Sequence, residues 1–592
     1  MAPPTSRSFH SQSKVSHPDT SHSIEARKAL RNYGLAPPNV ESHSLQAQRC
    51  MRQLESKTTP IERYIYLSNL RNSNVHLFYR LMLDNFTTLA PLIYTPVVGE
   101  ACQKWSEIYR QPEGLYLSYK DRGSLIDMLR NWPQSNVEMT VVTDGSRILG
   151  LGDLGVNGMG IPVGKLALYT GCAGIRPDLT LPLTLDLGTN NEALLADPLY
   201  MGSRMKRVSE KEEAEFLDEL MVALNEVWPG IVVQFEDFKN PFPALERYQN
   251  KYSCFNDDIQ GTGAVILAGI ISAMRKTGAA VKDQRAVFMG AGSAGVGVAK
   301  QIVEYFIKEG LTEEQARKCF WFVDTKGLIT NDRGDKLAAH KVYFSRDDNE
   351  GKQFKTLPEV VDFVKPTILM GLCTIRGIFD ESILKKMAAW NESPIIFPLS
   401  NPSDNAECTY EEAMKATNGK AIFASGSPFP DYVHNGKTMH PSQGNNMYVF
   451  PGIGLGSILC KAKHISQEMV PPPALPLLLA PLTHPQIYTS AVALSTTLKT
   501  AEFDSGMLYP SLPRIRSVSV VVARQVIRAA QRQDLDTATE LRAMDDEALD
   551  RWIESRMYDP RAENGFVELE REKATGGTGG VLEVLGVEAA KL

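Results

Sequence analysis

A glycine-rich turn between an apolar strand pattern and an amphipathic helix pattern limits the fold of this chain more than any other feature. The segment "QRAVFMGAGSAGVGVAKQIVEYFIKEG" covers residues 284–310 and carries the pattern G-x-G-x-x-G at Gly290, Gly292 and Gly295. Apolar residues recur at helical spacing after the turn, and the strand pattern "CFWFVDTKG" then ends in Asp324. Strand, glycine turn, helix and a second strand ending in an acid form the dinucleotide-binding fingerprint of Rossmann sheets.

Each glycine of this fingerprint has a distinct expected role. Gly290 makes the tight turn, Gly292 lets the pyrophosphate approach the backbone, and Gly295 packs the helix against the strand. The backbone N–H groups of the first helical turn, which includes Ser293 and Ala294, are predicted to face the phosphates. Asp324 lies further along than the usual spacing of about 20 residues, and "LTEEQARK" accounts for the excess as an extra turn. The alternative is a tight strand–helix turn that binds no ligand.

The alternation of strands and helices continues beyond Asp324. Buried strands are predicted at 366–372, 394–402 and 421–429, with the helical patterns "DESILKKMAAW" and "TYEEAMKAT" between them. This order predicts an α/β protein with a doubly wound parallel sheet, whose ligands bind at the carboxyl ends of the strands.

A second copy of the glycine pattern, "GLGDLGVNGMG" at 150–160, lacks this context. A strand pattern precedes it, but "GVNGMGIPVG" follows, and so many glycines and prolines predict a loop rather than a helix. We expect a glycine-rich loop where the backbone approaches a ligand or another strand, with Arg147 just before it.

Four carboxylates lie between the two glycine motifs. The strand pattern "GIVVQFEDF" (230–238) ends in Glu236 and Asp237, which can serve one ligand only if the strand has ended or bulged there. Asp257 and Asp258 precede a long apolar helix that is predicted to start near Ile259. An all-oxygen set suits Mg²⁺ or Mn²⁺. The alternatives are solvated surface acids and, for Asp258, a helix N-cap.

Lys165, in "GIPVGKLALYTG", would have mainly apolar neighbours on a helix. Such a lysine either extends its amine to water or is desolvated, and a desolvated amine is a candidate base.

Composition excludes several classes of protein. The 592 residues carry a net charge of −6 without a basic block, so no nucleic-acid partner is expected. The eight cysteines form no C-x-x-C pair, which indicates neither zinc nor disulfides and favours a reducing compartment. No apolar run reaches the length of about 18 residues that a membrane span needs, so no membrane partner is expected. The N-terminal residues are interpreted as a disordered tail in a cytoplasmic protein, with a mitochondrial transit peptide as the alternative.

Several long motifs, in order, resemble the malic enzyme family. They are "LIYTPVVGEAC", "VVTDGSRILGLGDLGVNGMGIPVGKLALYTGCAGI", "QFEDF", "CFNDDIQGT", "LSNPS", "FASGSPF" and "QGNNMYVFPG". The resemblance runs from about Pro60 to Ile465 and again over 489–560. It implies oxidative decarboxylation of L-malate to pyruvate and CO₂ with NADP or NAD, and a homotetramer. Two alternatives stay open, a malolactic-type lyase with bound NAD and an inactive NAD(P)-binding sensor.

The resemblance also implies a role for individual residues. Lys165 would be the general base, tuned by Asp257, and Tyr94 would protonate enolpyruvate. Arg147 would bind the malate carboxylate, and Asn401 and Asn445 would hydrogen-bond substrate and nicotinamide. The implied Mn²⁺ or Mg²⁺ ligands are Glu236, Asp237 and Asp258. Malic enzymes of both cofactor types carry the acid at Asp324, so the weak preference for NADP depends on Lys326 and Lys341, which would neutralise a 2′-phosphate.

The resemblance predicts a division into domains. These are a disordered N-terminus (1–25), a helical N-terminal domain (26–112), a substrate/metal α/β domain (113–257, continued by 446–530), a Rossmann NAD(P) domain (258–445) and a C-terminal segment with a disordered tail (531–592). A proline-rich stretch at 470–488 interrupts an expected helix, because proline removes an N–H donor and clashes with the preceding turn. A retained intron or gene-model error is the favoured explanation, and a partner site or a surface insertion specific to this protein are the alternatives.

Overall fold

The computed structural model describes residues 20–29, 33–334, 336–401, 403–466 and 486–561. The predicted disordered ends before residue 20 and after residue 561, and the predicted insertion up to residue 485, lie outside the described residues. The chain divides into two compact units, Met1–Ile231 with Ser555–Leu592, and Val232–Glu554. The finer division into domains stays a prediction.

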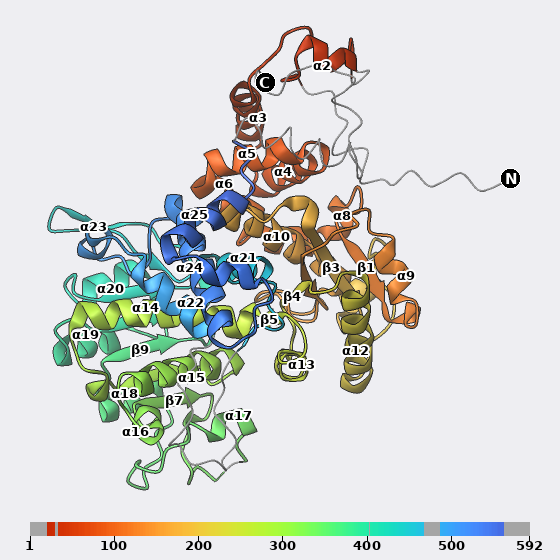
Figure 1. Cartoon of the computed structure of the whole chain (residues 1–592). Helices are drawn as coiled ribbons and strands as arrows, with labels where there is room; N and C mark the ends of the chain where they lie inside the picture. The colour runs from red at the N-terminus through yellow and green to blue at the C-terminus, as the bar shows by residue number, and fades with distance from the viewer. Residues whose placement is uncertain (1–19, 30–32, 335, 402, 467–485, 562–592) are drawn as a thin grey trace. The chain divides into compact units, whose positions relative to one another are not determined.

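The first unit begins with a run of helices (Figure 1). Three of them, which begin at His43, Pro60 and Val75, start after a residue whose side chain caps the first turn. Thr59 and Glu62, for example, form a capping box on either side of Pro60, which suits the first helical position. The helices are α2 (Ile24–Ala29), α3 (His43–Glu55), α4 (Pro60–Ser73), α5 (Val75–Asp84), α6 (Phe86–Ile93), α7 (Val97–Gln103) and α8 (Trp105–Ile108).

Three parallel strands follow in the first unit, in the order β1 (Leu115–Ser118), β3 (Thr180–Asp186), β2 (Met139–Thr143). All residues of β2 and β3 are buried, as expected for parallel strands covered on both faces. The accompanying helices are α9 (Leu125–Arg130), α10 (Gly160–Ala173), α11 (Glu192–Ala196) and α12 (Glu210–Val227).

The prediction of a loop over "GVNGMGIPVG" is wrong. Residues Gly155–Met159 form the 3₁₀ turn η2, and α10 begins directly after it at Gly160. The glycines serve close packing: a Cβ at Gly160 would lie 2.8 Å from Cys102 Sγ, and one at Gly164 would lie 2.9 Å from Tyr94 Cδ2. Tertiary packing therefore outweighs the low helix propensity of glycine in this buried helix.

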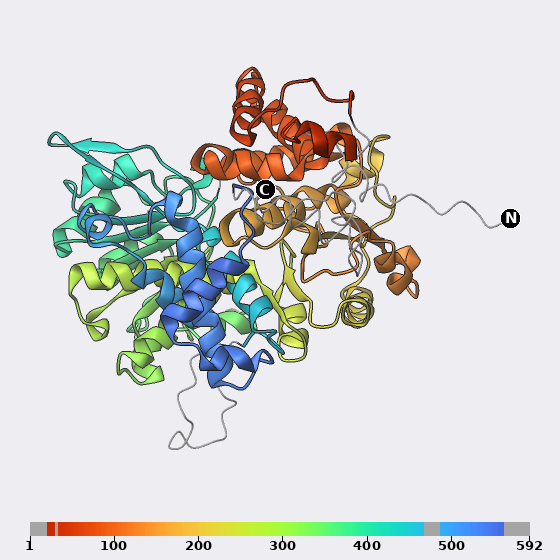
Figure 2. The same ribbon diagram turned by 45° about the horizontal axis from the view of Figure 1, so that its top comes forward.

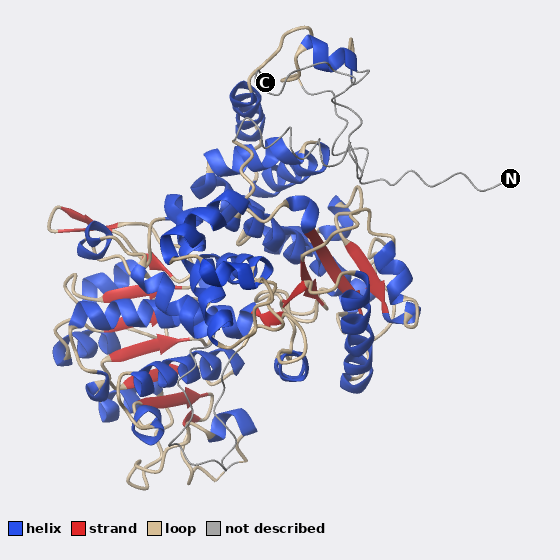
Figure 3. Ribbon diagram, in the orientation of Figure 1, coloured by secondary structure: helices blue, strands red, loops and turns tan. Residues whose placement is uncertain are grey.

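A seven-stranded sheet forms the core of the second unit (Figure 3). Its order is β14-β11-β10-β9-β6-β7-β8, and its neighbouring strands are parallel except β7 and β8, which are antiparallel. The bounds are β6 (Ala286–Met289), β7 (Phe320–Asp324), β8 (Gly327–Leu328), β9 (Ile368–Gly371), β10 (Ile395–Pro398), β11 (Ile422–Ser425) and β14 (Ser442–Gln443). The predicted doubly wound parallel sheet is confirmed.

Alternation along the strands divides their side chains between two helical layers. Val287 and Met289 of β6 belong to an apolar cluster with α18 (Leu357–Val364), α19 (Glu381–Trp390) and α20 (Tyr410–Ala416). Phe288 between them instead stacks on Phe322, next to α15 (Ser293–Lys308). The extra turn expected from "LTEEQARK" is α16 (Glu313–Arg317), and α17 (Ala339–Val342) follows β8.

The second unit also contains a helical layer built from segments far apart in sequence (Figure 2). In it α14 (Thr262–Thr277) packs on α22 (Gln486–Thr496), and α24 (Ile515–Arg532) packs on α22 and on α21 (Phe450–Leu459). Helix α22 begins inside the predicted insertion, and Ile487 and Tyr488 are buried. The other elements are β4 (Val232–Phe235), α13 (Phe242–Tyr248), β5 (Cys254–Asn256), β12 (Tyr432–His434), β13 (Lys437–Met439), α23 (Thr500–Asp504) and α25 (Asp546–Arg556). Across the described ranges, no helix combines the length and apolarity that crossing a bilayer requires.

Candidate functional site

The fingerprint turn has the geometry that the sequence predicts for each glycine. Gly290 has φ +115°, a value that residues with a side chain rarely adopt. A Cβ there would lie 2.4 Å from the carbonyl oxygen of Leu372. A Cβ at Gly295 would lie 2.5 Å from the carbonyl oxygen of Gly290. At Gly292, the N-cap of α15, a Cβ would meet nothing within 4 Å. The turn therefore has two glycines that packing requires, and one whose backbone faces open space at a helix N-terminus, where phosphate binds well.

Asp324, at the end of β7, is held by two cations. Arg333 donates to both of its carboxylate oxygens, at 2.8 and 3.1 Å, and Lys341 Nζ donates to Oδ2 at 2.8 Å. Burial raises the pKa of this carboxyl, but the hydrogen bonds from Arg333 and Lys341 outweigh it and leave the pKa below its usual value. Lys341 is one of the two lysines predicted from the sequence to lie here, whereas Arg333 was not predicted. Lys326 is exposed, and its backbone N–H donates to Asp324 Oδ1.

The carboxyl ends of the neighbouring strands carry the asparagines predicted to contact ligand. Asn401 follows β10, and its Oδ1 accepts a 2.7 Å hydrogen bond from Ser427 Oγ. Asn445 follows β14 and uses its Oδ1 to accept from the N–H of Met447. The buried carboxylate of Glu407 orders this edge, because it accepts from the N–H of Cys373 after β9 and from the N–H and hydroxyl of Ser400 after β10.

The predicted metal ligands lie at the ends of β4 and β5, which pair in parallel. Strand β4 ends at Phe235, and Asp237 has φ +58°, so the condition for Glu236 and Asp237 to serve one ligand is met. Asp258 does not cap the helix. Asn256 is the cap, and Asp258 lies in a π-helical turn, η4 (Asp257–Gly261), a form that often marks functional sites.

Two of these carboxylates accept hydrogen bonds from neighbouring groups of the protein. Asp258 Oδ2 accepts from the N–H of Asp237 at 2.8 Å, and Glu236 accepts from the side-chain amide of Gln234. Glu236 and Asp237 are buried, so neither is a solvated surface acid. The oxygen donors at one sheet edge fit a hard divalent cation, although no three His, Cys, Asp or Glu side chains of the described ranges converge as they would around an ion.

Asp257 is fully buried, and a residue that the sequence analysis did not single out holds it. Asn446 Nδ2 donates to Asp257 Oδ2 at 2.9 Å and to Thr262 Oγ1 at 2.9 Å. The only signal for Asn446 in the sequence was its position beside Asn445 in "GNN".

Lys165 and Tyr94 meet in the first unit. Lys165 Nζ donates to Tyr94 Oη at 3.4 Å and lies 5.2 Å from the centre of the tyrosine ring. Both side chains are buried, with 3% of Lys165 and 8% of Tyr94 exposed, so the alternative in which Lys165 extends to water is wrong. Tyr94 approaches this closely because Gly164, next to Lys165, has no side chain to block its ring.

Arg147 lies on the exposed side of the loop that joins β2 to η2. The same loop carries Leu149 and Leu151, and a Cβ at Gly99 of α7 would lie about 3.4–3.5 Å from their methyl groups. The loop therefore packs against the helix that follows Tyr94 in the chain.

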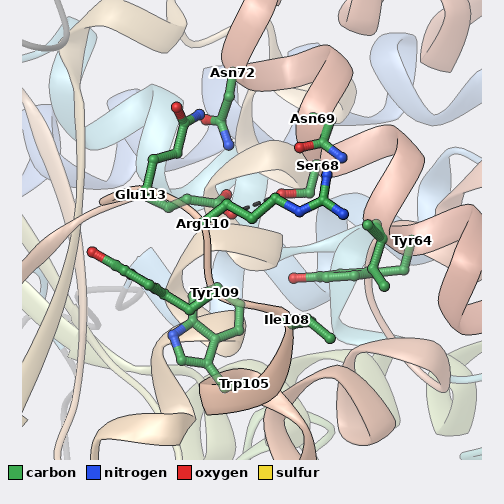
Figure 4. Close-up of a pocket in the computed structure, with 11 residues that line it drawn as sticks. Tyr64, Ser68, Asn69, Asn72, Trp105, Ile108, Tyr109, Arg110 and Glu113 are labelled. Atoms are coloured by element: carbon green, nitrogen blue, oxygen red, sulfur yellow. Dashed lines mark hydrogen bonds between the residues drawn. The ribbon is translucent and has the colours of Figure 1, made fainter. Parts of the chain in front are cut away.

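A separate cavity of about 20 Å³ lies beside α4 and α8 (Figure 4). Its lining includes Tyr64, Ser68, Trp105 and Glu113, and no predicted site residue contributes to it. The Tyr64 hydroxyl is buried without a hydrogen-bond partner of good geometry in the described part of the chain. The volume suits about one water molecule, which would satisfy this hydroxyl.

The fold and the fingerprint turn define an α/β protein with a Rossmann-type dinucleotide-binding domain. Residues 71–249 match the family described as "Malic enzyme, N-terminal domain", and residues 259–531 match "Malic enzyme, NAD binding domain". The chain belongs to the malic enzyme family.

Individual relatives agree with this assignment. The "NADP-dependent malic enzyme" of Dictyostelium discoideum is 46% identical over 93% of this chain and 98% of its own length, and that of Homo sapiens is 44% identical over 88% of each. The solved malic enzyme of Entamoeba histolytica shares the fold, with a TM-score of 0.54 at 20% identity over 93% of this chain and 96% of that one.

Proposed function

We propose that this chain catalyses the oxidative decarboxylation of L-malate to pyruvate and CO₂, with reduction of NADP⁺ and with a divalent metal ion. The observation that carries the proposal is the buried hydrogen bond between Lys165 Nζ and Tyr94 Oη. It places a candidate base and a candidate acid in contact. The relatives named "NADP-dependent malic enzyme" support the same reaction.

The two side chains act at different stages of the reaction. Lys165 takes the proton of the C2 hydroxyl as the C2–H bond breaks and the hydride leaves. The C3–C4 bond then breaks to release CO₂ and leaves the enolate of pyruvate. Tyr94 gives its proton to C3 of this enolate, and the proton held by Lys165 passes to Tyr94 along their hydrogen bond. Both groups are then back in their starting protonation states, and no further proton is taken up or released.

The remaining groups bind and orient. Arg147 pairs with a malate carboxylate, since a guanidinium matches a carboxylate bidentately. Glu236, Asp237 and Asp258 would hold the metal. When bound, the nicotinamide accepts the hydride, and the metal stabilises negative charge on the substrate as a Lewis acid.

The preference for NADP is supported by the charges around Asp324. Its carboxylate is already paired with Arg333 and Lys341, so these three side chains carry a net charge of one positive unit. A 2′-phosphate is attracted to such a group, whereas a ribose hydroxyl must compete with the two cations for Asp324.

The test is a stoichiometry measurement on the full chain with malate, NADP⁺ and Mg²⁺. We expect equal amounts of NADPH and pyruvate, and no product when the metal is chelated. Lactate without reduced cofactor would instead support the malolactic-type lyase, and cofactor binding without turnover would support the sensor. For the cofactor preference, kcat/KM is compared for NADP⁺ and NAD⁺ with wild type and Lys341→Ala. We expect the variant to lose about ten- to hundredfold with NADP⁺ only, and a large NAD⁺ preference that the variant does not change would refute the NADP assignment.

A further inference from the structure

The loop that carries Arg147 is closed on itself at its base. The N–H groups of Leu154 and Gly155 donate to the carbonyl oxygen of Gly145 at 3.0 and 3.2 Å, and Ile148 bridges Gly152. An acid stands at each end of this closed loop, Asp144 directly after β2 and Asp153 just before η2. The position of Arg147 therefore depends on how these two ends are held.

One side chain, Arg207, holds both ends. It donates to Asp144 Oδ2 at 3.0 Å and to the carbonyl oxygen of Asp144 at 3.1 Å. It also donates to both carboxylate oxygens of Asp153, at 2.8 and 3.2 Å. The side chains of Arg207 and Asp144 are 9% and 2% exposed, so water screens this group of charges poorly.

The acids are positioned by further donors. Asp153 accepts from the hydroxyl of Thr189 and the N–H of Asn190, both at 2.9 Å, and Asp144 accepts from the hydroxyl of Ser146 at 2.6 Å. These donors are neutral, whereas Arg207 pairs with both carboxylates as a cation. A lysine could not replace it, because one ammonium cannot reach acceptors on both sides as a planar guanidinium does.

We propose that Arg207 is a positioning residue for substrate binding, which fixes the loop that carries Arg147 and so sets the affinity for the malate carboxylate. This inference rests on the proposed function of Arg147. Removal of the guanidinium has two consequences, and both lower the affinity for malate. The loop loses the bridge between its ends, and two poorly hydrated carboxylates remain near the loop to repel the malate dianion.

The test compares Arg207→Lys with Arg204→Lys in the full chain with Mg²⁺. Arg204 is a matched control three residues away, because its guanidinium donates to backbone carbonyl oxygens of residues 195–200. We expect Arg207→Lys to raise the KM for malate about ten- to hundredfold while the KM for NADP⁺ stays within about twofold. Arg204→Lys should change neither constant by more than about twofold.

A second variant distinguishes loss of the bridge from misfolding of Arg207→Lys. Asp153→Asn weakens the same bridge from its other side, and it should also raise the KM for malate without changing the KM for NADP⁺. Unchanged malate constants in both variants would overturn the proposal, as would equal rises in both KM values with a lower melting temperature, since these indicate general destabilisation. Failure of the proposed function is distinguishable, because then the wild-type chain itself does not oxidise malate.

Discussion

Replacement of Gly292 by alanine separates the stability of the fingerprint turn from its capacity to bind a dinucleotide. The backbone there has φ −77° and ψ −179°, which any residue adopts, and an added Cβ meets no atom within 4 Å. Alanine restricts the unfolded chain and so stabilises by about 0.4–1 kcal/mol. It is a poorer N-cap than glycine, which costs about the same. The free energy of unfolding should therefore change by less than about 1 kcal/mol.

Cofactor binding should respond very differently. The methyl group of Gly292→Ala would occupy the open space at the N-terminus of α15, where the pyrophosphate is predicted to approach the backbone. A charge-assisted hydrogen bond from N–H to phosphate contributes about 1.5–3 kcal/mol, so the loss of one weakens binding about ten- to hundredfold. The same substitution should thus leave folding intact and reduce NADP⁺ affinity.

The assay pairs thermal unfolding with calorimetric titration of NADP⁺. Gly297→Ala is the matched control, because it lies in the same helix and an added Cβ would make only an ordinary 3.4 Å contact with Ile259. It should bind NADP⁺ as wild type does. Wild-type affinity in Gly292→Ala would refute the argument, since the pyrophosphate could not then lie against this turn.

Three further changes test other parts of the molecule. Lys165→Ala should abolish malate oxidation while calorimetry still detects NADP⁺ binding, and near wild-type oxidation would rule out Lys165 as the base. Burial, with the nearby charge of Asp144, raises the pKa of Glu213 from 4.5 to about 7. Its contribution to stability is therefore present below pH 4.5 and lost as the pH rises through about 7. Glu213→Gln should raise the melting temperature relative to wild type increasingly between pH 5 and 8, and a difference independent of pH would contradict this. A chain that lacks residues 470–485 should be as soluble and active as wild type, whereas one that lacks 470–488 should lose stability because Ile487 and Tyr488 are buried. Equal loss of activity in both would show that the proline-rich segment is needed.

The sequence by itself determined the Rossmann sheet and its fingerprint turn. Gly290, Gly292 and Gly295 form a pattern within one strand–turn–helix unit, so their roles depend on neighbours in the chain. The order of strands and helices after Asp324 also follows from the local periodicity of apolar residues. The end of β4 before Glu236 was a stated condition of the metal prediction, and the structure meets it.

Prediction from local sequence was wrong where tertiary packing outweighed the low helix propensity of glycine. The glycines after residue 155 indicate a loop by composition, yet they lie in η2 and α10, because Gly160 and Gly164 let Cys102 and Tyr94 approach the helix. The contact between Lys165 and Tyr94 joins residues 71 positions apart, and no periodicity connects them.

Only the tertiary structure decided which charges meet. Arg333 reaches Asp324 from the turn after β8 and Lys341 reaches it from α17. Asn446 reaches Asp257 from 189 positions away, and Arg207 joins two acids that precede it by more than fifty residues. The physical reason is that a local pattern reports on the backbone conformation of consecutive residues. A hydrogen bond between distant side chains depends instead on how folded elements bring them together, and a single sequence records that only through its complete fold.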